Sequence, residues 1–244
     1  MKRRLTRSGL IPVFAMLAFL VMPEAARADV EATVVWYMEQ EPGTEQFKVR
    51  YIVTPEYLRS DEGGDGEGFV LLDRKEKQIY NVVPGTGTVL EINGDGELPS
   101  PPASLSIEVQ ESIDRNAPRL EGHHALTLEL SANGTPCRSA IVVPGLLENV
   151  SEALAEFQQV LAVQQARMLG NTPEELKTPC YLANTVFATD YHVGRGIPLM
   201  EWRTGALSRE LLEYKRGVKM PESLFEMPED YRRFSPPADQ ALRR

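Results

Sequence analysis

Residues 47–53 read Phe-Lys-Val-Arg-Tyr-Ile-Val, and this short stretch decides the fold class. Four apolar side chains occupy every second position, with the basic Lys48 and Arg50 between them, which is the period of a β-strand that has one buried and one wet face. The same alternation returns in residues 34–38, 105–110 and 126–130. Strands with one wet face are typical of antiparallel sheets. The sequence therefore predicts a mainly β (α+β) protein built on an antiparallel sheet.

One long helix interrupts the strands. Apolar side chains recur at spacings of three, four or seven over residues 146–169, between Pro144-Gly145 and Gly170-Asn171. At about 1.5 Å per residue this helix is roughly 36 Å long, enough to cross a sheet. A short helical turn is expected at 173–177, and residues 181–189 favour helix over strand.

No change in composition divides the chain, so we expect a single domain over residues 29–234. Its helices form an insertion at about 146–190, between the two groups of strands. Two adjacent prolines and a polar end predict a disordered tail at 235–244.

Residues 1–28 have the organisation of a cleaved signal peptide. A basic start precedes an apolar run at 10–22, and Ala26-Arg27-Ala28 offers small residues at a cleavage site. Thirteen helical residues span about 20 Å, less than the roughly 30 Å of a hydrocarbon core, which disfavours the alternative of an uncleaved membrane anchor. We expect export to the periplasm of a Gram-negative bacterium, with no membrane-spanning segment after cleavage.

Cleavage would make an acidic protein more acidic. Residues 1–28 carry five basic side chains and one acidic side chain, so their loss changes the net charge from −9 to −13. Nucleic-acid binding requires clustered cations, so nucleic acid is not an expected partner.

Cys137 and Cys180 are the two cysteines, and both lie in the exported part. An even count in an oxidising compartment favours a disulfide between them, and two free buried thiols are the alternative. Two cysteines alone cannot form a structural zinc site.

No catalytic signature is present. The sequence lacks Gly-x-Ser-x-Gly, a phosphate-binding loop, a zincin helix and a dinucleotide-binding turn. The acidic loop at 61–67 lacks the ligand order of an EF-hand and is better interpreted as a solvated hairpin than as a calcium site. We therefore expect a protein that is not an enzyme and that has no cofactor and no metal site.

The predicted strands are rich in aromatic residues. These either fill a core against the long helix, or belong to a curved sheet whose concave face exceeds what one helix can cover, leaving an apolar cavity. On the second interpretation, the expected hydrophobic lining is Trp36, Phe47, Val49, Tyr51, Phe69 and Phe157.

The order of several motifs resembles the LolA/LolB-type periplasmic lipoprotein carriers, and in particular their uncharacterised relatives with a cysteine pair. The matching segments are Pro55-x-Tyr57-Leu58-Arg59, Phe69-Val70-Leu71-Leu72-Asp73, Ile79-Tyr80 before Pro84, Gly122-x-x-Ala125 before Cys137, and 196–231. The resemblance implies a curved antiparallel half-barrel with the long helix and shorter helical segments over its concave face. It also implies that acyl chains lie between the sheet and the helices.

Two functions follow as expectations. The first is a non-enzymatic periplasmic protein that holds a lipid, an acyl chain or a lipoprotein acyl chain in the half-barrel; about ten buried methylenes at about 0.8 kcal/mol each would give useful affinity. The alternative is a protein-interaction module of the cell envelope, with a filled core and an envelope protein as its partner.

Overall fold

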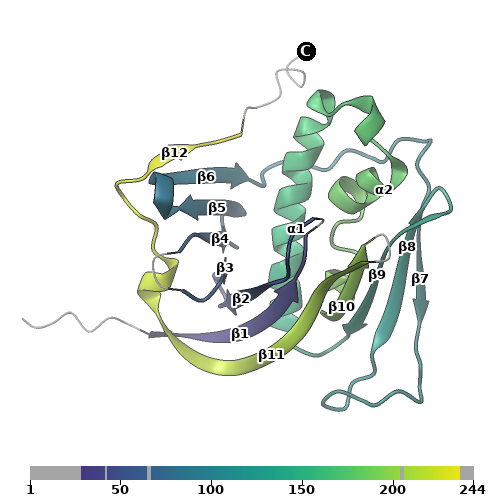
Figure 1. Cartoon of the computed structure of the whole chain (residues 1–244), viewed down its shortest axis with the longest axis horizontal. Helices are drawn as coiled ribbons and strands as arrows, with labels where there is room; N and C mark the ends of the chain where they lie inside the picture. Colours follow the sequence, from purple (N-terminus) through teal and green to yellow (C-terminus); the bar gives the residue numbers. More distant parts are fainter. Residues whose placement is uncertain (1–28, 42, 65–66, 204–205, 237–244) are drawn as a thin grey trace, which may run out of the picture.

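Twelve strands form one open sheet, in the order β12-β6-β5-β4-β3-β2-β1-β11-β10-β9-β8-β7 (Figure 1). The computed structural model describes residues 29–41, 43–64, 67–203 and 206–236. Neighbouring strands are antiparallel except for the terminal pair β12 and β6, which is parallel. The predicted mainly β class and antiparallel sheet are confirmed. The predicted signal peptide and residues 237–244 of the predicted tail lie outside the described residues.

The strand bounds, in chain order, are β1 (Asp29–Glu39), β2 (Phe47–Val53), β3 (Tyr57–Asp61), β4 (Phe69–Asp73), β5 (Gln78–Val83), β6 (Thr88–Asn93), β7 (Ile107–Ser112), β8 (Leu126–Ala132), β9 (Thr135–Val143), β10 (Ile197–Arg203), β11 (Ala206–Pro221) and β12 (Arg232–Phe234). The long strand β11 pairs with β1 along its length and with β10 only at its start. It therefore joins the N-terminal strands, β1–β6, to the strands β7–β10, which are called the C-terminal strands below.

The main helices lie together on one side of the sheet. They are α1 (Glu148–Met168), the short α2 (Pro179–Leu182) and the π-helical turn η4 (Ala183–Phe187). The single turns are η1 (Pro84–Thr86), η2 (Leu169–Asn171), η3 (Glu174–Leu176), η5 (Val193–Arg195) and η6 (Glu222–Phe225), and η6 packs on the opposite face. Figure 1 shows the sheet bent so that α1 lies between β3–β6 on one side and β8–β10 on the other. The long helix is confirmed, and the helical assignment of 181–189 is confirmed as far as Phe187.

The main hydrophobic core fills the space between α1 and the sheet. Side chains of one alternating set in β1, β2 and β3, including Val35, Tyr37 and Leu58, pack against Val150 and Leu154 of α1, and all five are almost fully buried. The helix presents these two residues on one face because they are four positions apart. The concave face beneath α1 is therefore occupied by side chains of the chain itself.

A second core lies on the opposite face of the N-terminal strands. Trp36 and Phe69 pack there with Phe225 of η6. The Arg59 guanidinium donates to the Leu224 carbonyl at 2.6 Å and fixes this C-terminal segment to the sheet. The segment after β11 thus covers a face that would otherwise be apolar and exposed.

A disulfide joins Cys137 in β9 to Cys180 in α2. It connects the C-terminal strands to the helical layer, and it confirms the predicted pairing. The bond is compatible with an oxidising, secreted compartment. Within the described part of the chain, no helix has the length and apolar character that crossing a membrane requires.

Removing the disulfide should lower the stability of the chain. The bridge spans a sequence separation of 43, so in the chain-entropy model Cys137→Ser with Cys180→Ser lowers the free energy of unfolding by about 4 kcal/mol. Urea unfolding measures the difference. A reductant should destabilise the parent protein and leave the double variant unchanged; equal stability of the two oxidised proteins would contradict the prediction.

Candidate functional site

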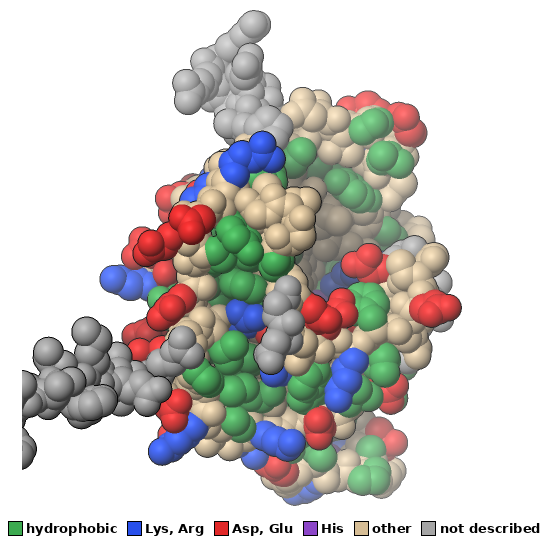
Figure 2. Space-filling model, turned by 60° about the vertical axis from the view of Figure 1, so that its left-hand side comes forward, with side chains coloured by type: hydrophobic (Ala, Val, Ile, Leu, Met, Phe, Trp, Pro, Cys, Tyr) green, Lys and Arg blue, Asp and Glu red, His purple; other side chains and the backbone are tan. Residues whose placement is uncertain are grey.

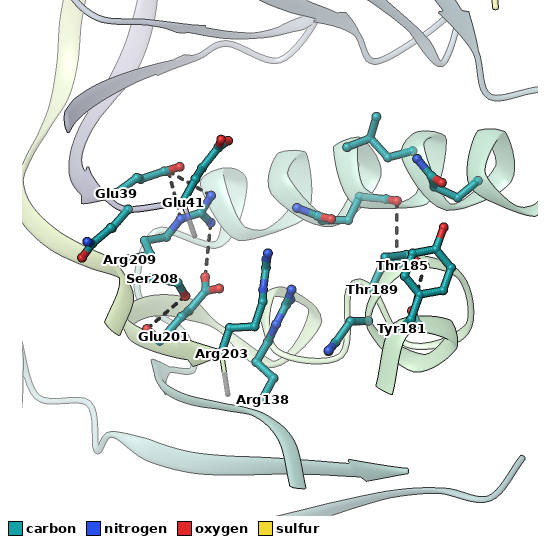
Figure 3. A pocket seen from close by; sticks show the side chains of 15 residues that line it. Glu39, Glu41, Arg138, Tyr181, Thr185, Thr189, Glu201, Arg203, Ser208 and Arg209 are labelled. Atoms are coloured by element: carbon teal, nitrogen blue, oxygen red, sulfur yellow. Dashed lines mark hydrogen bonds and ion pairs between the residues drawn. The ribbon is translucent and has the colours of Figure 1, made fainter. Parts of the chain in front are cut away.

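A cavity of about 480 Å³ opens where the C-terminal strands separate from the helices. Its walls come from β1, β9, β10, β11, α1, α2 and η4, and most of its lining side chains are polar (Figure 3). The lining residues are Glu39, Gln40, Glu41, Arg138, Gln158, Leu161, Gln165, Tyr181, Asn184, Thr185, Thr189, Glu201, Arg203, Ser208 and Arg209. Ligand sites of this kind combine a concave shape with a few convergent polar groups.

Strand register brings three charges together at one end of the cavity. Arg209 in β11 lies opposite Glu39 of β1 on one side and opposite Glu201 of β10 on the other. Its guanidinium donates to Glu39 Oε1 at 3.0 Å and to Glu201 Oε1 at 3.2 Å. Cross-strand partners of opposite charge stabilise a sheet, and here one arginine ties three strands together.

Two further side chains complete this cluster. The Tyr51 hydroxyl donates to Glu39 Oε1 at 2.8 Å and accepts from Arg209 Nη2 at 3.1 Å. His192, which is buried, places Nε2 at 3.1 Å from Glu201 Oε1. Both carboxylates of the cluster are thus held by side chains of the chain.

Contacts within the cluster determine the protonation states of Glu201 and His192 at neutral pH. Burial opposes ionisation of Glu201, but His192 and Arg209 outweigh it and lower the pKa of this carboxyl well below its ordinary value. Burial lowers the pKa of His192, although Glu201 partly offsets the effect. At neutral pH Glu201 is therefore an anion and His192 is neutral.

Arg138 differs from Arg209 in having no such partners. Its side chain lies in the cavity wall beside that of Arg203 (Figure 3), and the residue is only 8% exposed. Its Nε has no hydrogen-bond partner, and the described residues provide no carboxylate within ion-pair distance of the guanidinium. Burial is the main cause that lowers the pKa of Arg138; Glu201 partly offsets it and Arg203 adds to it.

The structure separates the six residues predicted as one hydrophobic lining. Phe47, Val49, Tyr51 and Phe157 all pack in the core beneath α1, and among these Val49 and Tyr51 are buried. Trp36 and Phe69 lie in the second core, on the opposite face of the sheet.

The reason for this separation is the alternation along a strand. In β1, Val35 and Tyr37 face α1, so Trp36 between them faces away; in β4, Leu72 faces α1 and Phe69 faces away. Six residues on two faces cannot line one cavity. Tyr51 alone reaches the polar cluster, through its hydroxyl.

The polar residues of the cavity were not identified from the sequence, although a signal for two of them exists. Arg138 occupies the same alternating set as Ala140 and Val142, which are fully buried in β9. Glu201 interrupts the otherwise mostly apolar run of β10. A charged residue at a position whose strand neighbours are buried indicates a functional or ion-paired group.

The described residues contain no group of three or more His, Cys, Asp and Glu side chains arranged to hold a metal ion.

No protein-family model and no curated protein matches this sequence. Solved structures with some similarity include PNGF-II in two crystal forms, at 9% and 11% sequence identity and a TM-score of 0.41 in both cases. The alignments cover 85% and 87% of this chain and 32% of the PNGF-II chain, so this chain spans about a third of that protein. A likeness this distant carries no functional information.

Glu201→Gln should destabilise the chain in a pH-dependent way. Breaking a buried ion pair costs about 3 kcal/mol, so we expect this loss at pH 7. The pKa of Glu201 is depressed in the folded chain, so its stabilisation is complete above the ordinary carboxyl value of 4.5 and is lost as the pH falls below it. The stability gap to the parent should therefore shrink on acidification.

Urea unfolding between pH 7 and pH 3 measures this gap. Glu108→Gln on the exposed face of the edge strand β7 is the matched control and should follow the parent at every pH. A gap for Glu201→Gln that stays constant or widens towards low pH would contradict the assignment of an ionised Glu201.

Proposed function

We propose that the protein is a non-enzymatic binding protein that holds a small molecule in the cavity between the C-terminal strands and the helices. The observation that carries the proposal is the cavity itself, which is about 480 Å³ and has polar side chains from seven elements converging on it. This volume lies within the range of small-molecule sites, about 300–1,000 Å³.

The walls of the cavity are built to stay in place. Arg209 ties β1, β10 and β11 together, and the disulfide ties β9 to α2. A site whose walls are fixed before binding loses less conformational entropy when the ligand enters. This supports a binding site over a chance gap between elements.

The proposed ligand is amphipathic, not wholly apolar. Apolar side chains of the chain fill the space beneath α1, whereas Leu161 is the one aliphatic side chain among the described residues that line the cavity. Leu161 packs against the main core, as do Phe47 and Phe157. An acyl chain would contact apolar surface only on the Leu161 side of the cavity. The remaining walls are polar and require a polar group on the ligand.

The cellular setting of the proposal is the periplasm. The disulfide agrees with export, and the open antiparallel sheet with helices on one side agrees with a LolA/LolB-like scaffold. Membership of that family and carriage of a lipid or lipoprotein acyl chain remain part of the proposal.

Filling the cavity should abolish ligand retention. Leu161→Trp places a larger ring in the cavity from the middle of α1, so we expect the variant to fold and to lose any molecule that co-purifies with the full chain. Native mass spectrometry of protein purified from the periplasm measures retention. The control is Leu176→Trp, at a position that is 56% exposed and outside the cavity; it should retain the ligand.

A parent chain that carries no small molecule, but co-purifies with an envelope protein, would refute this proposal and favour the interaction module. Equal retention by Leu161→Trp and the parent would place the bound molecule elsewhere.

A further inference from the structure

Arg138 is a buried cation that forms no ion pair with the residues the structure describes. It lines the cavity, is 8% exposed, and its Nε makes no hydrogen bond within the described residues. An ionised group taken out of water without a partner costs several kcal/mol, so buried charges are normally paired. The exception points to a partner that is not part of the chain.

Three carboxylates line the cavity, and two of them, Glu39 and Glu201, are held by other side chains, whereas Glu41 lies at an exposed position. Glu201 Oε1 accepts from Arg209 and lies 3.1 Å from His192, and Glu39 Oε1 accepts from Arg209 and Tyr51. Arg203 extends into the same cavity beside Arg138 (Figure 3). The positive charge of Arg203 therefore adds to the cost of burying a second cation at Arg138.

A second buried polar atom without a partner belongs to a residue that lines the cavity from the helical side. Asn184 in η4 lines it, and its Oδ1 is buried without a hydrogen-bond partner. The disulfide holds the two sides together, because Cys137 precedes Arg138 in β9 and Cys180 lies one helical turn before Asn184. An amide oxygen requires a donor, which a hydroxyl group supplies.

We infer that, within the proposed function, Arg138 binds the oxyanion of a hydroxyl-bearing ligand, and that Asn184 accepts a hydrogen bond from one of its hydroxyl groups. The oxyanion is a carboxylate or a phosphate, since the planar guanidinium fork matches both. A phosphate with neighbouring hydroxyl groups occurs in free sugar phosphates and in the headgroup of phosphatidylglycerol, and the two sources share this chemistry.

Four probes distinguish the alternatives by isothermal titration calorimetry on the full mature chain. They are glycerol 3-phosphate, glycerate, uncharged glycerol and dihexanoyl phosphatidylglycerol below its micellar concentration. We expect binding of at least one anionic probe and none of glycerol. Tighter binding of the lipid than of glycerol 3-phosphate assigns the site to a headgroup, and equal or weaker binding assigns it to a soluble anion.

The decisive variant is Arg138→Met. It should weaken binding of the anionic probe at least tenfold, while the ligand-free variant unfolds at the same or a higher urea concentration than the parent, because an unpaired buried charge is lost. Arg119→Met, at an exposed loop position away from the cavity, is the control and should bind like the parent.

Each outcome bears on one of the two proposals. If the parent retains a molecule that Leu161→Trp loses, but Arg138→Met binds it equally well, the oxyanion inference fails and the binding function stands. Failure of the parent to bind any of the three anionic probes also overturns the inference. If Leu161→Trp has no effect on retention, the binding function fails at this cavity.

Discussion

The packing of α1 into the bend of the sheet is the contact on which the rest of the structure depends. Strands with one wet face must bury the other, and α1 supplies the opposing apolar surface through residues such as Val150 and Leu154. The sheet is longer than one helix can cover, so α2 and η4 cover the strands beyond it, joined to them by the disulfide. The cavity lies where these two helical units meet the end of β1 (Figure 3).

The two faces of the sheet are stabilised by different means. On the N-terminal strands, the face turned away from α1 is covered by the chain's own C-terminal segment, whose Phe225 stacks on Tyr57. Hydrophobic side chains gather on the surface around this segment and the neighbouring strands in the view of Figure 2. On the C-terminal strands, the helical face carries Glu201 and Arg209 beside apolar residues. Charges can be buried there because strand register places each beside an opposite charge.

Sequence patterns predicted which residues form strands and helices, but not which face of each strand packs against the long helix. The alternation in residues 47–53 and the helical spacing in 146–169 are local, so β2 and α1 could be assigned without knowing their neighbours. Which face of a strand meets the helix depends on contacts made far along the chain. Trp36 is the example: its alternation is clear, but it faces away from α1 because Val35 and Tyr37 pack against that helix. The pairing of β1 with β11, and the parallel strand β12, are equally non-local.

The cavity was not predicted for a related reason. The expected lining was apolar, whereas the side chains that line the cavity are mostly polar. Arg138 and Glu201 occupy strand positions that pattern analysis assigns to the interior, where a charge looks like an exception to the rule. The structure divides these exceptions into two kinds. Glu201 is compensated by the ion pair with Arg209, so its burial is explained by the fold. Arg138 forms no ion pair with the described residues, and Glu201 offsets its burial only in part, so a bound anion would supply the partner that the fold does not.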